Sequence, residues 1–456
     1  MKRNVMILAA GKSKRMKSKT GKFLHPVLGK PVIRYVVDMS ERLGSQTTVV
    51  IVNNDFEPVK QALYDKTLDY AVQDPQLGTG HAVMCGIDLI DGGSTLILLG
   101  DAPCIRQETL SDLFDVHEQH QADLTVLSVD LRDPTGYGRI LRDGDRVIGI
   151  REHRDCTPEE LLITEINSGV FLVNTDRLKE YLPQLRNDNA QQEYYVTDLL
   201  GLMNEAGLTV RAHVIADADE VIGINTRQQL WDVTRVMQGR INDHWMQEGV
   251  TMMQPDSIFI DDTVQIAPDA VIYPGTHLRG NTSIAEDAII GPNAIVTNCR
   301  IVERSTVDQS TISDSVIGAD THVGPYAFMR PGSVVGDHCK VGDFVEVKNA
   351  TLGNNTKISH LSYIGDGEVG DNVNIGCGTV FVNYDGLKKH RTVIEDNAFV
   401  GCNVNLVSPV VVGRGAYVAA GTTVTEDVPA KSLSVGRCRQ TIKEGWAEGK
   451  NKAAKE

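Results

Sequence analysis

The sequence predicts two domains of different fold: a Rossmann-like α/β domain with a mostly parallel sheet, followed by a parallel β-helix. Three observations support this prediction. Over residues 1–226, apolar runs of strand length alternate with amphipathic stretches, as in α/β domains. Residues 227–250 have helical spacing and predict a linker helix. Over residues 251–456, apolar residues return every six positions, which fits neither a helix nor a simple strand.

The length and charge of the chain exclude several classes of protein. Its 456 residues are enough for two or more domains, and its net charge of -15 argues against general binding to nucleic acid or anionic membranes. The first apolar run stops at Gly11, too early for a signal peptide or a membrane span, so we expect no membrane insertion. The eight cysteines show no Cys-x-x-Cys pair and no zinc spacing, which indicates free thiols in a reducing cytoplasm.

The strands of the first domain are expected at residues 5–10, 48–52, 95–99, 124–129 and 170–173. Ligands of parallel sheets lie beyond the carboxyl ends of the strands. The first such end carries small residues that let backbone N–H groups approach a base or a phosphate, and Arg15 and Lys22 follow it with positive charge. The alternative is a surface turn with a solvated basic run. A P-loop is excluded, because no Gly-Lys-Ser/Thr closes the stretch.

A carboxylate follows another predicted strand. Asp101 comes directly after Leu99 and Gly100, where a hard divalent cation could be bound. The alternative for a single aspartate at such a position is a helix cap or a turn residue.

In the second half, the step of six is continuous over residues 266–296, 317–347 and 394–424. Each hexad would form a short strand and a turn, with the aliphatic side chain inside and Gly or Asn at the turn. Stacked coils then share one core. The step shortens to five after Val347 and after Ile364, and it lengthens to seven between Leu387 and Ile394, beside a basic loop.

Polar residues gather near these interruptions: Arg330, Lys348, His360, Tyr363, Asn374, Asn383, Tyr384 and Lys389. About three hexads make one coil, so residues roughly 18 apart lie above one another. Arg330 and Lys348 have that separation and could bind one phosphate from adjacent coils. The His360 imidazole could accept a proton from an amine. The alternative for His360 is a surface histidine hydrogen-bonded within the repeat.

The N-terminal motifs resemble those of sugar-nucleotidyltransferases and occur in the order of that family. The loop from Leu8 to Met16 is similar to the family's signature loop, except that Ser13-Lys14 replaces Gly-Thr and Thr20-Gly21 replaces Leu-Pro. Ser13 must therefore adopt a backbone conformation that the family gives to glycine. In the reaction that this resemblance implies, a sugar 1-phosphate attacks the α-phosphorus of a nucleoside triphosphate and releases pyrophosphate.

The same resemblance implies the residues of this first site. Asp101 and Asn225 would be ligands of Mg²⁺, Gln73 and residues 76–82 would read uracil, and residues 134–139 would contact sugar or ribose. The residues expected to bind UTP and the UDP-sugar are Leu8, Ala9, Ala10, Gly11, Arg15, Lys22, Gln73, Gly78, Thr79, Leu99, Gly100, Asp101, Gly138, Glu152, Asn167 and Asn225.

Nearly the whole chain resembles a bacterial family of bifunctional N-acetylglucosamine-1-phosphate uridyltransferase/glucosamine-1-phosphate N-acetyltransferases. The segments that carry the likeness in the second half are residues 330–332, 343–346, 360–363, 374–378 and 383–386. The family implies a left-handed β-helix and a homotrimer whose acetyl-transfer sites are shared between copies. It also implies synthesis of UDP-N-acetylglucosamine, a cell-wall precursor, from glucosamine 1-phosphate, acetyl-CoA and UTP.

By this resemblance His360 is the base that deprotonates the sugar amine. Arg330, Lys348, Tyr363 and Asn374 would bind glucosamine 1-phosphate. The residues expected to line the acetyl-CoA site are Cys377, Asn383, Tyr384, Lys389, Cys402, Ala420 and Arg437. Cys377 and Cys402 replace the Ala and Ser of other members, so they are interpreted as wall positions and not as nucleophiles.

Two other functions fit the sequence. The β-helix could be catalytically silent and serve only assembly or regulation, although the phased Arg330 and Lys348 together with His360 argue against this. Alternatively, the altered loop at Ser13-Lys14 could leave a first domain that binds nucleotide without turnover.

Overall fold

The structure is a computed structural model that describes residues 2–448. The chain divides into two compact units, Met1–Arg240 and Ile241–Glu456, each with its own core. Helix α7 (Arg227–Gln247) occupies the stretch for which a linker helix is predicted, while the predicted domain boundaries at residues 226 and 250 stay predictions. Residues 449–456 of the predicted second domain lie outside the described residues.

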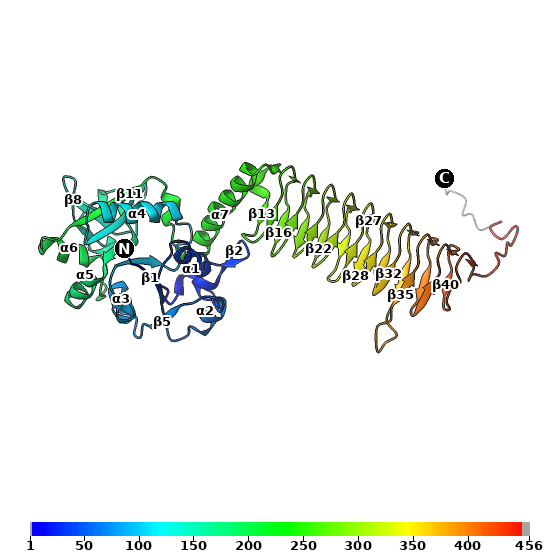
Figure 1. Cartoon of the computed structure of the whole chain (residues 1–456), viewed down its shortest axis with the longest axis horizontal. Helices are drawn as coiled ribbons and strands as arrows, with labels where there is room; N and C mark the ends of the chain where they lie inside the picture. Colours follow the sequence, from blue (N-terminus) through cyan, green and yellow to red (C-terminus); the bar gives the residue numbers. More distant parts are fainter. Residues whose placement is uncertain (1, 449–456) are drawn as a thin grey trace. The chain divides into compact units, whose positions relative to one another are not determined.

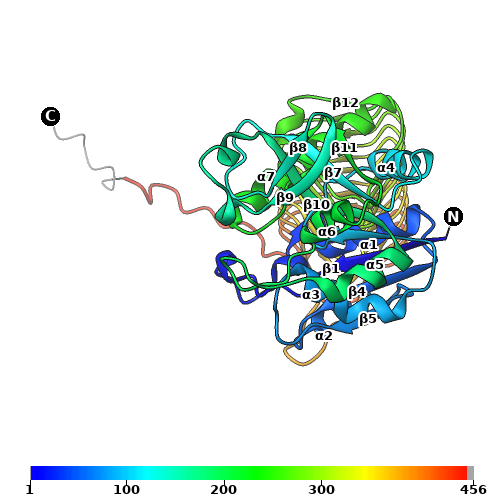
Figure 2. The same cartoon turned by 90° about the vertical axis from the view of Figure 1, so that its left-hand side faces the viewer.

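The first unit is built on a sheet with the strand order β11-β7-β10-β6-β1-β4-β5, and Figure 2 looks onto this unit. Strands β1, β4, β5 and β6 pair in parallel, and so do β7 and β11. Strand β10 runs antiparallel to both β6 and β7, and a hairpin of β8 and β9 pairs with it. The strands are β1 (Arg3–Leu8), β4 (Thr47–Val52), β5 (Asp69–Val72), β6 (Ser94–Leu99), β7 (Leu124–Asp130), β8 (Arg139–Asp143), β9 (Arg146–Arg151), β10 (Glu165–Asn174) and β11 (Val210–Ile215).

Helices cover both faces of this sheet because its strands alternate buried side chains between two cores. In β1, Val5 and Ile7 belong to one core and Met6 and Leu8 to the other, as the two-residue repeat of a strand requires. The first core also contains α1 (Val32–Arg42) and α4 (Gln107–Gln119). The second contains α3 (Thr79–Gly86), α5 (Thr175–Tyr181) and α6 (Asp198–Glu205). The predicted α/β class with a mostly parallel sheet is confirmed.

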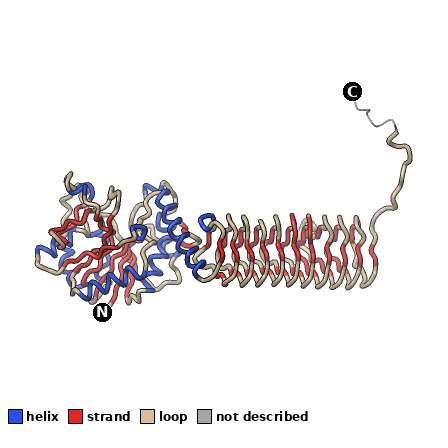
Figure 3. The backbone as a smooth tube through the Cα atoms, turned by 90° about the horizontal axis from the view of Figure 1, so that it is seen from above, coloured by secondary structure: helices blue, strands red, loops and turns tan. Residues whose placement is uncertain are grey.

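The second unit is a left-handed parallel β-helix, as predicted. Its strands form three parallel sheets of eleven, ten and nine strands. Consecutive strands enter the three sheets in turn from β12 (Thr251–Met252) to β40 (Thr423–Val424), and β41 (Leu433–Ser434) then joins the first sheet beside β39 (Tyr417–Val418). Figures 1 and 3 show the stacked coils, with strands in columns and turns at the corners. One continuous core fills the interior, and it contains the aliphatic residues of the predicted repeat.

The coils that carry candidate site residues contribute strands to all three sheets. The first sheet contributes β27 (Lys340–Asp343), β30 (Lys357–His360), β33 (Asn374–Ile375), β36 (Phe399–Val400) and β39 (Tyr417–Val418). The second contributes β25 (Phe328–Met329), β28 (Glu346–Lys348), β31 (Tyr363–Gly365) and β34 (Val380–Val382). The third contributes β29 (Thr351–Leu352), β32 (Gly367–Val369) and β35 (Thr392–Ile394). Within residues 2–448, no helix has both the length and the apolar character that crossing a membrane would require.

The interruption before Ile394 is larger than the sequence indicates. Leu387 was expected to occupy a core position of the repeat, and this is wrong, because its side chain is 93% exposed. Phe381, which is 1% exposed, holds the preceding core position, and Ile394 holds the next. Residues 383–391 therefore form a loop that projects from the stack beside β35 (Figure 1). A leucine that happens to follow Phe381 by six residues matches the repeat in spacing alone.

Phe381→Ala is expected to lower the free energy of unfolding of the β-helix by about 3–5 kcal/mol, because it leaves a cavity in the core. The ring fills the space above Gly367, where a Cβ atom on that glycine would come within 2.6 Å of Phe381 Cε2. Urea denaturation followed by circular dichroism measures the change. Leu387→Ala is the matched control, with an expected change within about 0.5 kcal/mol. Equal losses of stability from the two substitutions would contradict the assignment of Leu387 to an exposed loop.

Candidate active sites

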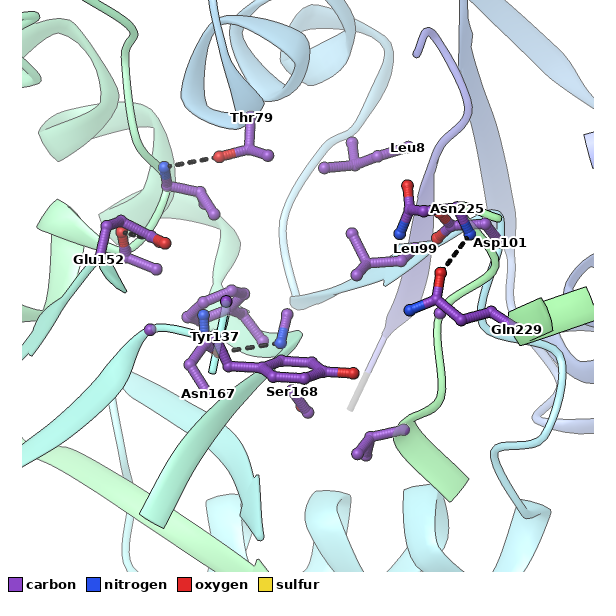
Figure 4. A pocket seen from close by; sticks show the side chains of 18 of the residues that line it. Leu8, Thr79, Leu99, Asp101, Tyr137, Glu152, Asn167, Ser168, Asn225 and Gln229 are labelled. Carbon is purple, nitrogen blue, oxygen red and sulfur yellow. Dashed lines mark hydrogen bonds between the residues drawn. The ribbon is translucent and has the colours of Figure 1, made fainter. Parts of the chain in front are cut away.

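A cavity of about 320 Å³ lies at the carboxyl edge of the first unit's sheet (Figure 4). Leu8 and Leu99 are paired residues at the ends of β1 and β6, so parallel pairing brings two distant segments to this edge. The predicted residues that line the cavity are Leu8, Arg15, Thr79, Leu99, Asp101, Gly138, Glu152, Asn167 and Asn225. Within the described chain, its lining does not include the predicted residues Ala9, Ala10, Gly11, Lys22, Gln73, Gly78 and Gly100.

Asp101 and Asn225 meet although they are far apart in the sequence. The Ile224 N–H donates a hydrogen bond of 2.9 Å to the Asp101 carbonyl, which ties the two segments together. The Lys22 ammonium group forms an ion pair with the Asp101 carboxylate and donates a hydrogen bond of 2.9 Å to Asn225 Oδ1. Asp101 is 7% exposed, so this lysine supplies the positive charge that a buried carboxylate requires.

The two side chains fit the predicted metal site. One oxygen atom of Asp101 and one of Asn225 already contact the same cation, the Lys22 ammonium group, so these oxygen atoms converge on one point. Mg²⁺ is commonly held by one or two protein oxygen ligands together with substrate phosphates and water. Among residues 2–448, there is no group of three or more His, Cys, Asp and Glu side chains that could hold a metal without a substrate.

Gln229 is a lining residue that the sequence did not single out. Its Oε1 accepts a hydrogen bond of 2.9 Å from the Asn225 N–H, and its amide nitrogen points into the cavity (Figure 4). Gln229 therefore fixes the backbone of Asn225 from the first turn of α7. The only sequence signal was its position four residues after Asn225 in a helical stretch.

The loop after β1 contains the strained residue that the sequence predicts. Ser13 has φ 53° and ψ 23°, the left-handed region that favours glycine. Its Oγ accepts a hydrogen bond of 3.0 Å from the Lys22 N–H. The serine thus gives the backbone of Lys22 an anchor that glycine could not provide.

The side of the cavity for which sugar contacts are predicted is formed by β10, by the segment before β8 and by the residue after β9. The Asn167 N–H donates a hydrogen bond of 2.9 Å to the Gly138 carbonyl, and Asn167 Oδ1 accepts a hydrogen bond of 2.9 Å from the Gly169 N–H. The Thr197 hydroxyl donates 3.3 Å to Glu152 Oε1. Burial raises the pKa of Glu152 above its ordinary value, and the nearby Asp198 adds to that rise. Tyr137 and Thr197 line the same wall.

Gln73 and Gly78 lie behind the start of α3. Gln73 is buried, and its Nε2 donates a hydrogen bond of 2.8 Å to the Gly78 carbonyl. The same nitrogen atom lies 3.2 Å from His81 Nδ1. Gly78 has φ 105°, and a side-chain carbon there would come within 2.5 Å of the Tyr194 carbonyl oxygen. The glycine is therefore required by close backbone packing, which presents Thr79 to the cavity.

In the second unit, Arg330 and Lys348 lie at the second sheet, and Lys389 from a neighbouring loop approaches Lys348. Met329 pairs with Val347, so the next residues, Arg330 and Lys348, are neighbours on adjacent coils, as their spacing predicts. Arg330 Nη1 donates a hydrogen bond of 2.8 Å to Glu346 Oε1. The ammonium group of Lys389 lowers the pKa of Lys348, with a smaller contribution from Arg330. Lys389 belongs to the loop of residues 383–391 and forms an isolated β-bridge with Tyr384.

Tyr363 and Asn383 continue this group along the same sheet. Tyr363 lies one coil above Glu346. Asn383 Nδ2 lies 3.5 Å from the Tyr363 hydroxyl and donates a hydrogen bond of 2.6 Å to Asp366 Oδ2. Asp366 is an acidic partner that the sequence did not indicate, and Glu346 was indicated only as part of the motif of residues 343–346.

His360 lies at the end of the first-sheet strand β30, at the corner before β31. Its Nδ1 is 2.5 Å from Oδ1 of Asp343, the paired residue one coil below. The hydrogen bond from His360 lowers the pKa of Asp343. The sequence analysis quoted Asp343 only as part of a motif, although its separation of 17 residues from His360 is nearly one coil.

A column of predicted residues continues above His360. The Asn403 N–H donates a hydrogen bond of 2.7 Å to the Cys377 carbonyl, and the Gly421 N–H donates one of 2.8 Å to the Cys402 carbonyl. Cys377, Cys402 and Ala420 therefore follow one another on successive coils. The Arg437 guanidinium group donates to the Ala420 carbonyl. Four of the seven residues expected to line an acetyl-CoA site, Cys377, Cys402, Ala420 and Arg437, thus lie along one edge of the first sheet. Asn383, Tyr384 and Lys389 lie after the second-sheet strand β34.

Asn374 lies apart from the column of residues above His360. It starts β33 and pairs with Lys357, three residues before His360. At about 3.3 Å per residue, this places Asn374 roughly 10 Å along the strand from the position above His360.

Comparisons with known proteins follow the same division of the chain. Residues 5–192 match the MobA-like NTP transferase domain, residues 256–337 the GMPPB C-terminal domain, and residues 391–426 the bacterial transferase hexapeptide family. The chain is 48% identical over 451 residues to the bifunctional protein GlmU of an Exiguobacterium species, covering 98% of this chain and 100% of the relative. It is also 47% identical over 449 residues to GlmU of Clostridioides difficile, covering 98% and 97%.

The chain belongs to the GlmU family. Like its relatives it is a bifunctional transferase, with a nucleotidyltransferase unit and a hexapeptide transferase unit that together make UDP-N-acetylglucosamine. GlmU of Brevibacillus brevis is 46% identical over 447 residues, covering 97% of both chains, so the likeness spans both units.

The GlmU nucleotidyltransferase unit has a pH-sensitive carboxylate beside its cavity. Burial, and the proximity of Asp188, raise the pKa of Asp198 from 3.8 to about 6. When an acid has a higher pKa in the folded protein than in the unfolded chain, its ionisation destabilises the folded protein. We therefore expect the stability of the wild type relative to Asp198→Asn to fall as the pH rises from about 4 to about 6, and then to level off.

Denaturation midpoints of both proteins, measured from pH 4 to pH 8, give this difference. Glu205→Gln, which removes an exposed charge from the far end of α6, is the matched control. A wild-type stability that rises relative to Asp198→Asn over this interval would contradict the raised pKa.

Proposed function

We propose that the two activities of this GlmU-family chain are carried out at the two groups of side chains described above. Uridylyl transfer from UTP to N-acetylglucosamine 1-phosphate would use the cavity around Asp101 and Asn225. Acetyl transfer from acetyl-CoA to glucosamine 1-phosphate would use His360 on the first sheet and the basic residues Arg330 and Lys348 at the second sheet. The observation that carries this assignment is that each compact unit holds one such group, and that each group has the charges its reaction needs.

Uridylyl transfer requires placement and charge neutralisation more than covalent help. Arg15 and Lys22 would hold the phosphates of UTP, and Glu152 and Asn167 would bind sugar hydroxyls. Mg²⁺, held by Asp101 and Asn225, would neutralise triphosphate charge when bound. The attacking oxygen belongs to a phosphate that is already ionised, so this side of the reaction needs no general base.

Acetyl transfer requires a neutral amine beside a thioester. Asp343 holds one nitrogen of the His360 imidazole, which leaves the other nitrogen to accept the proton of the sugar amine. Arg330 and Lys348 would bind the sugar phosphate from adjacent coils. The amine would then attack the thioester carbonyl and release the coenzyme A thiolate. The thioester is already activated, so correct placement is the main requirement.

The active assembly is proposed to be a homotrimer. Three corners on successive coils carry Tyr326, Phe344 and Leu361, at φ 58°, 55° and 47°, with 55%, 58% and 58% of each residue exposed. Bulky residues disfavour this backbone region, and most other corners with positive φ hold Asp, Asn or Gly. An exposed apolar ridge beside His360 is the kind of surface that another copy would bury.

The position of Asn374 supports a site shared between copies. One chain leaves Asn374 at the far end of its strand from the column above His360. If Asn374 binds the substrate handled by His360, a second copy must present it. We also propose a cytoplasmic location, in keeping with eight free cysteines, and a role in supplying cell-wall precursors.

Asp101→Ala is expected to abolish uridylyl transfer, measured as pyrophosphate release from UTP and N-acetylglucosamine 1-phosphate. His360→Ala is expected to lower the kcat of acetyl transfer by about 10²- to 10⁴-fold, the usual contribution of a general base. Release of the coenzyme A thiol from acetyl-CoA and glucosamine 1-phosphate measures the second activity. Each variant serves as the control for the other, because each should retain the activity of the opposite unit. Loss of both activities from either change would refute the assignment.

Asp343→Asn is expected to lower acetyl transfer by about 10- to 100-fold, because the imidazole loses its orienting carboxylate. The rate of coenzyme A thiol release from acetyl-CoA and glucosamine 1-phosphate measures the change. An unchanged rate would show that the Asp343–His360 contact has no role in the reaction.

A further inference from the structure

The metal-binding pair of the first unit is already in contact with a cation from its own chain. The Lys22 ammonium group is ion-paired with Asp101 and hydrogen-bonded to Asn225 Oδ1 at 2.9 Å. These are the two oxygen ligands assigned to Mg²⁺ above. The Lys22 and Asp101 side chains are 12% and 10% exposed, so water screens the pair little.

A divalent ion cannot bind both oxygen atoms while the ammonium group lies against them. Two cations at hydrogen-bonding distance from the same oxygen atoms would repel each other strongly in this buried position. Metal binding therefore requires the Lys22 side chain to leave.

The structure allows the side chain to move while its backbone stays in place. The Lys22 N–H is anchored by the Ser13 hydroxyl at 3.0 Å, within the loop that leads to the cavity. Arg15 from the same loop lines the cavity, so the start of this segment already faces the space that a triphosphate would fill. A lysine with four rotatable side-chain bonds can reach a new anion from a fixed backbone.

We propose that Lys22 is an exchangeable counter-ion for the metal ligands. In the nucleotide-free protein it neutralises Asp101 and orients Asn225, and it moves to the nucleotide phosphates when the metal–nucleotide complex binds. This inference rests on the proposed function, which assigns Asp101 and Asn225 to the metal.

The exchange keeps the site paired in both states. Without nucleotide, the lysine charge offsets the buried carboxylate. With nucleotide, the metal takes the two oxygen atoms and the lysine gains phosphate oxygen atoms as partners. A divalent ion alone offers the displaced lysine no such partner, so it should bind weakly, whereas metal and nucleotide should bind together.

The test measures Mn²⁺ binding to the full-length protein without nucleotide, from the electron paramagnetic resonance signal of free Mn²⁺. Lys22→Met removes the charge and keeps the length of the side chain. We expect it to tighten Mn²⁺ binding at least tenfold. Arg15→Met is the matched control: it removes a positive charge from the same cavity, and among the described residues Arg15 makes no ion pair with Asp101 or Asn225. Its expected change is less than twofold.

A second readout uses a non-hydrolysable UTP analogue. The analogue should tighten Mn²⁺ binding to the wild type far more than to Lys22→Met, because only the wild type has a lysine to transfer. Lys22→Gln repeats both measurements, and thermal melting confirms that each variant is folded. Equal Mn²⁺ affinity of wild type, Lys22→Met and Lys22→Gln would overturn the exchange.

Asp101→Asn in the Lys22→Met background separates the two possible failures. If this double variant binds Mn²⁺ as tightly as Lys22→Met, the metal is not on Asp101, and the proposed metal site fails together with the exchange. If the double variant loses Mn²⁺ while Lys22→Met binds no more tightly than the wild type, the metal site stands and only the exchange fails.

Discussion

Parallel pairing between strands that are distant in the sequence is the constraint on which both sites depend. In the first unit it places the ends of β1 and β6 side by side, so Leu8 and Leu99 border one cavity and Asp101 follows at its edge. In the second unit the same pairing repeats once per coil and sets Asp343 beside His360. Because parallel partners run in the same direction, their carboxyl ends meet at one edge, and loops from different parts of the chain converge there.

Charge compensation is the second feature that the two sites share. The cationic groups assigned to substrate anions are already paired with carboxylates: Lys22 with Asp101, and Arg330 with Glu346. In a chain with a net charge of -15, such pairs hold long basic side chains near the position where a phosphate would arrive. Under the proposed assignment, substrate binding at either site would exchange one anionic partner for another, which costs less than fixing a freely moving side chain.

Much of the fold and the site could be read from the sequence because both rest on local periodicity or local motifs. The six-residue step predicted the coils, and the separation of Arg330 from Lys348 predicted their neighbouring positions on adjacent coils. The departure at Ser13 predicted a left-handed backbone, since a serine in a glycine position must adopt it. The failure at Leu387 has the opposite cause, because spacing alone does not distinguish a core leucine from one at the tip of a loop.

The sequence by itself determined the two folds, the strand ends that carry Asp101 and the phase that stacks the basic residues of the β-helix. Hydrophobic periodicity and turn residues are properties of neighbouring positions, so they are visible without a structure. Only the tertiary structure decided that Lys22 lies between Asp101 and Asn225, that Gln229 holds the Asn225 backbone, and that Asp343 is the partner of His360. Those contacts join side chains from separate strands and helices. Their distances are fixed by how the elements pack, and no local pattern records them.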